Sequence, residues 1–179
     1  MSSVLSIRDA SFAPLGRAVS SVPLDGLRAA LQTLPLPDSG MTYHPREDCL
    51  HAQLDFEPWG AQLFADLPYQ LGWCAGSNER ADCLVRHGGS GFLWSETAFD
   101  LLLAPRWDPR ALRRFRVPAQ TLVELYGDTL RSAPLGTGFR LLAILPYATN
   151  TAYSAPDPLD PALYARNTWR IALTKEEQP

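Results

Sequence analysis

From residue 69 onward, the chain is a series of short apolar runs of three to seven residues, separated by Gly, Pro, Asn and Asp. Runs of this length and spacing predict β-strands, and many of them in succession predict an antiparallel sandwich or barrel. The predicted strands are 70–74, 82–87, 91–94, 99–104, 115–117, 121–126, 129–133, 139–145 and 168–173. The sequence therefore predicts a mainly β fold.

The first 68 residues follow a different pattern. Residues 23–34 begin with Pro, carry Leu at every third or fourth position and precede Pro35, which predicts a helix. A second, short helix is expected around 62–67. Residues 1–22 read as an extended or irregular arm, and 36–45 as a turn-rich connection.

A length of 179 residues fits a single domain, 1–179. We expect an N-terminal arm, helix and connections over 1–68, and a β-barrel core over 69–179. Within the core, 108–114 reads as one helical turn and 147–165 as a long Pro-rich loop. The short helical part is then a cap on the barrel.

Several classes of protein are disfavoured by charge and hydropathy. No stretch approaches the roughly 18 apolar residues of a membrane span, and residues 1–8 lack the basic and apolar segments of a secretory signal. The formal net charge is −3, with no acidic or basic block, which argues against nucleic-acid binding. Cys49, Cys74 and Cys83 form no CxxC, so we expect reduced thiols. The expected protein is cytoplasmic, with no membrane or nucleic-acid partner.

One predicted hairpin carries a candidate site. The Gly-Asp pair at 127–128 separates two β-rich runs and is typical of a two-residue hairpin loop. Its register places Glu124 opposite Arg131 on one face, and Leu125 opposite Leu130 on the other. On a solvent face, the ion pair contributes about 0.2–1 kcal/mol; inside a barrel, both charges need a partner or ligand. We favour the interior, since ligands usually bind at a barrel mouth.

A second candidate is His87, which ends a predicted strand just before a Gly-rich turn, 88–91. Its imidazole, with an ordinary pKa of about 6.5, suits general acid–base chemistry near neutral pH. The alternative is a hydrogen-bonded structural histidine. His44 and His51 read as loop residues. Glu124 is the other candidate catalytic group, although a neighbouring Arg lowers the pKa of a carboxylate and weakens it as a base.

Arg131 is the candidate anchor for a substrate's negative charge, because its guanidinium forms bidentate hydrogen bonds with carboxylates and phosphates. Three further residues are candidate substrate-binding groups, namely Tyr126, Arg140 and Asn167. For Arg140 and Asn167, the alternative is that they brace the long loop.

Five segments in order resemble an uncharacterised, single-domain branch of the cupin superfamily, a domain of unknown function. They are TLPLPDSGMTY (33–43), QLGWCAGSN (70–78), FRVPAQTLVELYGDTLRSAP (115–134), GFRLLAILPYATN (138–150) and YARNTWRIA (164–172). The resemblance covers nearly the whole chain. It implies a double-stranded β-helix, or jelly-roll barrel, that forms a homodimer and binds a small molecule inside.

The resemblance also implies four positions where such proteins hold metal ligands. Here they are occupied by Val85, His87, Gly91 and Arg131, with Glu124 retained on the hairpin. Val and Gly supply no ligand atom, and Arg keeps its proton. We therefore expect no cofactor, and a cationic site for a small anion or a sugar-like metabolite in place of a divalent metal.

A looser similarity links SFAPLGRAV (11–19), RHGGSGFL (86–93) and VPAQT (117–121) to ureidoglycolate lyases. It implies cleavage of a carbon–nitrogen bond in a small hydroxy acid, but Gln120 stands where those proteins have Gly. Three functions stay open: an isomerase, epimerase or lyase; a metal-free binding or sensor protein; and a scaffold in which the Glu–Arg pair is structural.

Overall fold

Two β-sheets packed face to face form the body of the protein. The computed structural model describes residues 3–20, 22–79, 84–85, 87 and 89–147. Its strands are β1 (Leu5–Ser6), β2 (Gly16–Val19), β3 (Met41–His44), β4 (Tyr69–Asn78), β5 (Gly91–Ser95), β6 (Phe99–Pro105), β7 (Arg113–Val117), β8 (Leu122–Leu125), β9 (Thr129–Arg131) and β10 (Gly136–Pro146). Its helices are η1 (Ala10–Phe12), α1 (Asp25–Thr33), α2 (Asp48–His51), η2 (Leu54–Phe56) and α3 (Glu57–Phe64).

The strands alternate between the two sheets along the chain. One sheet has the order β1-β7-β6-β9, and the other has the order β2-β8-β5-β10-β4-β3. All pairs are antiparallel except β1 with β7. The chain crosses from one sheet to the other between β1 and β2, between β5 and β6, between β7 and β8, and again on each side of β9. This mainly β, jelly-roll sandwich confirms the predicted fold class.

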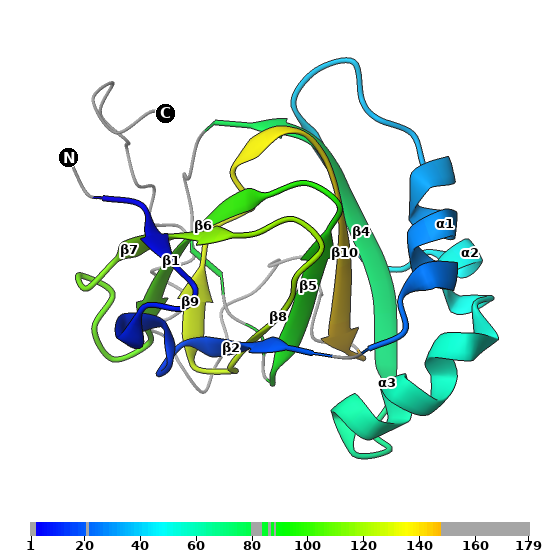
Figure 1. Ribbon diagram of the computed structural model, residues 1–179, viewed down its shortest axis with the longest axis horizontal. Helices are drawn as coiled ribbons and strands as arrows, with labels where there is room; N and C mark the ends of the chain where they lie inside the picture. Colours follow the sequence, from blue (N-terminus) through cyan, green and yellow to red (C-terminus); the bar gives the residue numbers. More distant parts are fainter. Residues whose placement is uncertain (1–2, 21, 80–83, 86, 88, 148–179) are drawn as a thin grey trace, which may run out of the picture.

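Two apolar clusters hold the layers together. The inner cluster lies between the sheets and includes Phe99, Phe115 and Phe139, all almost fully buried. The outer cluster joins the far face of the six-stranded sheet to the helices, with Trp73 of β4 against Leu27 and its neighbours. Figure 1 shows α1, α2 and α3 together on one side of the molecule, beside β4 and β10. The predicted helical cap therefore covers one face of the larger sheet.

Helix α1 forms where its sequence pattern predicts it. Leu27 and Leu31 are buried one turn apart, Asp25 lies in the first turn, and Pro35 follows the C-cap residue. The second predicted helix, 62–67, forms earlier in the chain as α3. Its C-cap, Ala65, has a left-handed backbone with φ of 50°, which ends the helix inside the expected range.

The boundary drawn at residue 68 does not separate a cap from a barrel. Strands β1, β2 and β3 all come from the first 68 residues, and each pairs with a strand from the later part of the chain. Within 108–114, residues 108–111 form a hydrogen-bonded turn and 113–114 already belong to β7, so the predicted helical turn is wrong. The predicted strand at 168–173 and most of the loop at 147–165 lie outside the described residues.

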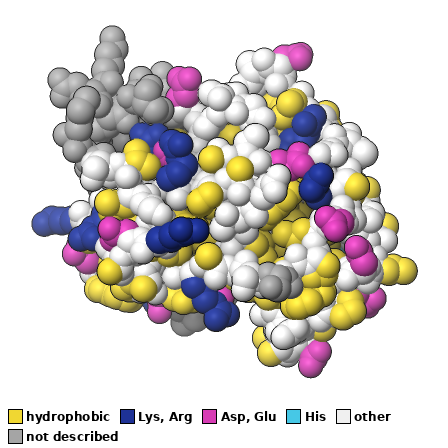
Figure 2. Space-filling model, in the orientation of Figure 1, with side chains coloured by type: hydrophobic (Ala, Val, Ile, Leu, Met, Phe, Trp, Pro, Cys, Tyr) yellow, Lys and Arg dark blue, Asp and Glu magenta, His cyan; other side chains and the backbone are white. Residues whose placement is uncertain are grey.

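On the face of the molecule drawn in Figure 2, charged groups of both signs are interspersed. Figure 2 shows Lys and Arg side chains among Asp and Glu side chains on one face of the molecule. No helix in the described part of the chain has both the length and the apolar composition that crossing a bilayer requires.

His51 joins α2 to β4 by accepting a hydrogen bond at Nε2 from the backbone N–H of Leu71, at 2.9 Å. A protonated imidazole cannot accept this bond. Burial, together with the positive charge of Arg46, lowers the pKa of His51 below its ordinary value, and Asp48 acts in the opposite direction. The neutral form is therefore the one that stabilises the fold.

We expect the melting temperature to fall, by roughly 2 °C or more, as the pH falls below about 6.5, because the unfolded chain then binds the proton more readily than the folded one. The loss is complete once the pH passes below the lowered pKa. In a His51→Gln variant this part of the pH dependence disappears, whereas it persists in His44→Gln. The prediction would be contradicted if the melting temperatures of wild type and His51→Gln changed with pH in the same way between pH 7.5 and 5.

Candidate functional site

Arg131 lies on the inner face of β9, between the two sheets. Its neighbour Leu130 packs on the outer face, against Leu84 and Ala104. Successive side chains of a strand alternate between faces, so the side chain of Arg131 points inward. Arg131 is only 9% exposed. The four-stranded sheet therefore carries a buried guanidinium toward the six-stranded sheet.

His87 contacts this guanidinium directly, through its Nε2 and Nη2 of Arg131. An arginine side chain only donates hydrogen bonds, so Nε2 of His87 is the acceptor and the imidazole proton is on Nδ1. The backbone beside this contact is held in place, because Val85, two residues before His87, exchanges both N–H···O bonds with Arg131, at 2.8 Å each. His87 is thus a neutral partner of a buried cation.

Gly91, the first residue of β5, makes room for the guanidinium from the opposite sheet. A Cβ atom at this position would lie 2.6 Å from Cδ2 of Leu145 and 3.4 Å from Nη1 of Arg131. Any larger side chain would displace one of the two. Val85, His87, Gly91 and Arg131 therefore come together, although only the resemblance had related the four positions to each other.

The charge of Arg131 also acts on two further groups, Tyr43 and Cys74. Tyr43 of β3 lies directly opposite Cys74 of β4, and Cys74 belongs to the inner cluster. Burial raises the pKa of each group to about 12, while the positive charge of Arg131 acts in the opposite direction on both. The phenol and the thiol are therefore protonated, neutral groups near physiological pH. We call Arg131, His87 and Gly91 the Arg131 site.

The predicted pairing of Glu124 with Arg131 is wrong. In the six-stranded sheet, Glu124 lies opposite Arg17 of β2, and the Nε of Arg17 donates to its Oε2 at 2.7 Å. The flanking residues Val123 and Leu125 belong to the inner cluster, so Glu124 points to the other face of the sheet. The structure thus separates Glu124 from His87 and Arg131.

The physical reason is that the two strands of the expected hairpin enter different sheets. The tight turn does form, since the backbone N–H of Thr129 donates to the carbonyl of Tyr126 at 2.9 Å. After it, however, β8 pairs with β2 and β5, whereas β9 pairs with β6, with Leu103 opposite Arg131. A local turn signal gives no information about these non-local partners.

The other predicted binding residues have different positions. Arg140 donates from Nε to the carbonyl of Leu34, at 2.8 Å, on the helix-covered side of the sheet, so it joins β10 to the end of α1 and does not face the inner cluster. Tyr126 lies at the turn, and its backbone N–H donates to the carbonyl of Leu15 at 3.0 Å. Asn167 lies outside the described residues, as does Cys83. His44 and His51, expected in loops, lie in β3 and α2.

The Arg131 site does not fit a divalent metal. Of the four positions that the resemblance relates to metal ligands, only His87 has a ligand atom, and Arg131 donates to its Nε2. The thiol of Cys74 is protonated near neutral pH. Across the described ranges, no group of three or more His, Cys, Asp and Glu side chains is placed to hold a metal ion.

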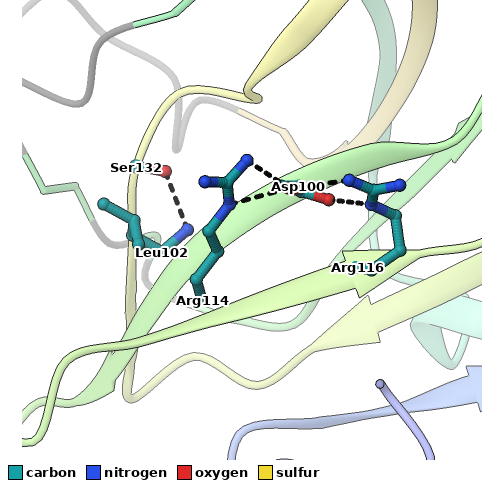
Figure 3. A network of polar contacts seen from close by, with 5 residues as sticks. All are labelled: Asp100, Leu102, Arg114, Arg116 and Ser132. Atoms are coloured by element: carbon teal, nitrogen blue, oxygen red, sulfur yellow. Dashed lines mark hydrogen bonds and ion pairs between the residues drawn. The ribbon is translucent and has the colours of Figure 1, made fainter. Parts of the chain in front are cut away.

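A second polar cluster lies on the outer face of the four-stranded sheet and is shown in Figure 3. Asp100 of β6 is 2% exposed and lies between Arg114 and Arg116 of β7. Nε and Nη2 of Arg114 donate to its Oδ2 at 2.7 and 2.6 Å, and Nη2 of Arg116 donates to the same atom at 3.2 Å. The carboxylate is fully engaged, so this cluster joins strands rather than presenting a reactive group.

Searches of solved structures find distant likenesses. The chain is 12% identical to HppE in a complex of CoII HppE with Tris buffer, over 64% of this chain and 57% of that one, with a TM-score of 0.38. It is 10% identical to a mutant of the Bacillus subtilis oxalate decarboxylase OxdC, over 82% of this chain and 36% of that one, with a TM-score of 0.40. The chain thus spans just over half of the first protein and about a third of the second.

A third structure is the non-heme alpha ketoglutarate dependent epimerase SnoN from nogalamycin biosynthesis, which is 14% identical over 98% of this chain and 91% of that one, with a TM-score of 0.42. No curated protein sequence matches this chain. One family model matches residues 4–179, nearly the whole sequence, and its description is "Domain of unknown function (DUF4867)". The chain therefore belongs to the DUF4867 family, in agreement with the resemblance to an uncharacterised single-domain family.

Proposed function

We propose that this protein binds a small metabolite with a carboxylate or phosphate group between its two sheets, and that Arg131 anchors the negative charge. The observation that carries the proposal is that Arg131, a cationic residue only 9% exposed, lies on the inner face of the sandwich with Nε2 of His87 against its guanidinium. Charge-assisted hydrogen bonds are strong where water is largely excluded, and a guanidinium fits both anions bidentately.

The experiment is a binding survey on the full-length protein, by calorimetric titration and melting temperature. The ligands are small carboxylates, hydroxy acids and sugar phosphates, each tested beside a neutral amide or alcohol of similar shape. A ligand that binds only the folded state at about 100 times its Kd stabilises it by about 2.7 kcal/mol. Anions alone are expected to raise the melting temperature. Equal shifts with the neutral analogues, or none with any anion, would overturn the proposal.

His87 gives the same site a means of proton transfer. When a bound anion takes hydrogen bonds of the guanidinium, Nε2 of His87 is released and can accept a proton from the carbon next to the carboxylate. The electron pair of that C–H bond moves onto the carboxylate oxygens, where Arg131 stabilises it, and return of the proton to the opposite face of the same carbon completes an epimerisation. This chemistry needs neither Glu124 nor a metal.

His87→Gln tests this step. Gln retains an oxygen that accepts from Arg131, so ligand binding is expected to change by less than about 3-fold, whereas turnover of a bound hydroxy acid or sugar acid falls by at least about 100-fold. Exchange of the carbon-bound proton with deuterated water, followed by NMR, measures the step directly. Exchange at the wild-type rate in the variant would remove His87 from the mechanism and leave the binding proposal intact.

A further inference from the structure

Strand β3 is an edge of the six-stranded sheet, and its outer side has no partner among the described strands. The carbonyl of Gly40 accepts a hydrogen bond from the backbone N–H of Ser77, at 2.7 Å, one position before the first pair of the β3–β4 register. Hydrogen-bonded pairs alternate along an antiparallel ladder, so Thr42 bonds to β4. The backbone N–H and C=O groups of Met41 and Tyr43 therefore point away from the sheet.

The other sheet edges carry features that discourage the pairing of further strands. Strand β2, at the opposite edge of the same sheet, carries Arg17, whose side chain is 66% exposed. In the smaller sheet, β1 has only two residues, and Arg131 of β9 exchanges both of its backbone hydrogen bonds with Val85. Short strands, charged side chains and covered edges all prevent edge-to-edge association. Strand β3, with the sequence MTYH, carries no Lys, Arg, Asp or Glu.

The side chains on one face of β3 are large, apolar and exposed. Tyr43 lies opposite Cys74, which packs in the inner cluster, so Met41 and Tyr43 both lie on the inner face. They are 37% and 41% exposed. Thr42 lies opposite Ala75 of the outer cluster and therefore on the other face. An open backbone edge with exposed apolar side chains beside it is suited to pairing with another strand.

A second copy of β3 fits this edge in one antiparallel register. With a two-fold axis at Thr42, Met41 of each copy lies opposite Tyr43 of the other, and these two pairs use all the backbone groups that point outward. The thioether of Met41 then packs on the phenol ring of Tyr43 on the inner face. On the other face, the two Thr42 side chains lie opposite each other, a favourable cross-strand pair. A two-fold contact brings like residues together, and β3 brings no carboxylate, ammonium or guanidinium group to the axis.

We propose that two copies of this chain associate through their β3 strands, antiparallel and with Thr42 at the two-fold axis, so that their six-stranded sheets become one continuous sheet. Four residues from each copy form a small contact, so we expect a dimer that dissociates on dilution. The Arg131 site lies between the sheets of each copy. Dimerisation and anion binding are therefore separate properties, and each can fail without the other.

The test is the mass of the full-length protein in solution, measured by sedimentation equilibrium over roughly 1–200 μM. The mean mass of the wild type is expected to rise with concentration from 19.8 kDa, the mass of one chain, toward twice that value. Thr42→Lys places two positive charges directly opposite each other, so the Kd of its dimer should rise at least about 10-fold. Thr42→Glu is expected to have the same effect through two negative charges. An equimolar mixture of the two variants restores the dimer, because each Lys then lies opposite a Glu.

Ala18→Lys is the matched control. Ala18 is exposed on β2, at the opposite edge of the same sheet, so a charge there should leave the dimer at its wild-type Kd. Circular dichroism identifies the variants that are folded. The proposal is overturned if the wild type stays at the mass of one chain throughout the range, or if Thr42→Lys dimerises as the wild type does. It is equally overturned if the folded Lys and Glu variants stay monomeric when mixed.

Discussion

Arg131→Gln is expected to weaken the binding of small carboxylates and phosphates by at least about 100-fold, or about 2.7 kcal/mol. Gln is polar and has a shorter side chain, but it lacks the charge and the fork of parallel donors that hold an anion. Because the guanidinium is buried, its attraction to an anion is only weakly screened by water or salt. Calorimetric titration of both proteins with the best anion of the survey measures the loss.

Two other variants separate charge from fold. Arg17 of β2 lies beside Glu124, on the face of the six-stranded sheet that points away from Arg131, and its side chain is 66% exposed. Arg17→Gln therefore removes a distant cation and should leave anion binding unchanged. Arg131→Lys keeps the charge without the bidentate geometry, so an intermediate affinity is expected. Wild-type affinity in a folded Arg131→Gln protein would show that the anion binds elsewhere.

The largest loss of stability is expected from Asp100→Asn, at about 3 kcal/mol of the free energy of unfolding. The substitution removes the negative charge between Arg114 and Arg116 but keeps the shape of the side chain. The side chain of Arg114 is 12% exposed, so its guanidinium would remain buried without its counter-charge. Urea denaturation of wild type and variant, each followed by circular dichroism, gives the difference.

Arg116→Gln provides the comparison for this cluster. The side chain of Arg116 is 53% exposed and can be hydrated on its own, and Asp100 keeps its two hydrogen bonds from Arg114. We expect a loss of about 1 kcal/mol or less. A loss as large as that of Asp100→Asn, or a loss below 1 kcal/mol in Asp100→Asn itself, would show that the cluster contributes little through its buried charge.

Local sequence patterns were sufficient for the elements, but not for their partners. Apolar runs marked strands such as β5 and β6 closely, because strands buried on both faces are mostly apolar, and the one charge in β6, Asp100, is paired with two arginines. The hairpin register placed Leu125 and Leu130 on one face, yet Leu125 packs between the sheets and Leu130 on the outer face with Leu84. That choice depends on strands far away in sequence.

The candidate site was predictable only in part, for the same reason. The expected hairpin register drew attention to Arg131, the Gly-rich turn drew attention to His87, and the resemblance to cupins added Val85 and Gly91. Strand β3 was missed because its four residues follow a turn-rich segment and are mostly exposed. The alternation of MTYH was the one signal available, and it is too short to distinguish an edge strand from a loop.

The edges of the six-stranded sheet have a consequence for how the chain folds during synthesis. Both edge strands, β2 and β3, come from the first 44 residues, but β2 pairs with β8, about a hundred residues later. During synthesis, β2 therefore has no sheet partner until residues 122–125 follow. We expect slow folding, dominated by long-range contacts, and an early chain whose unpaired backbone edges are prone to aggregate.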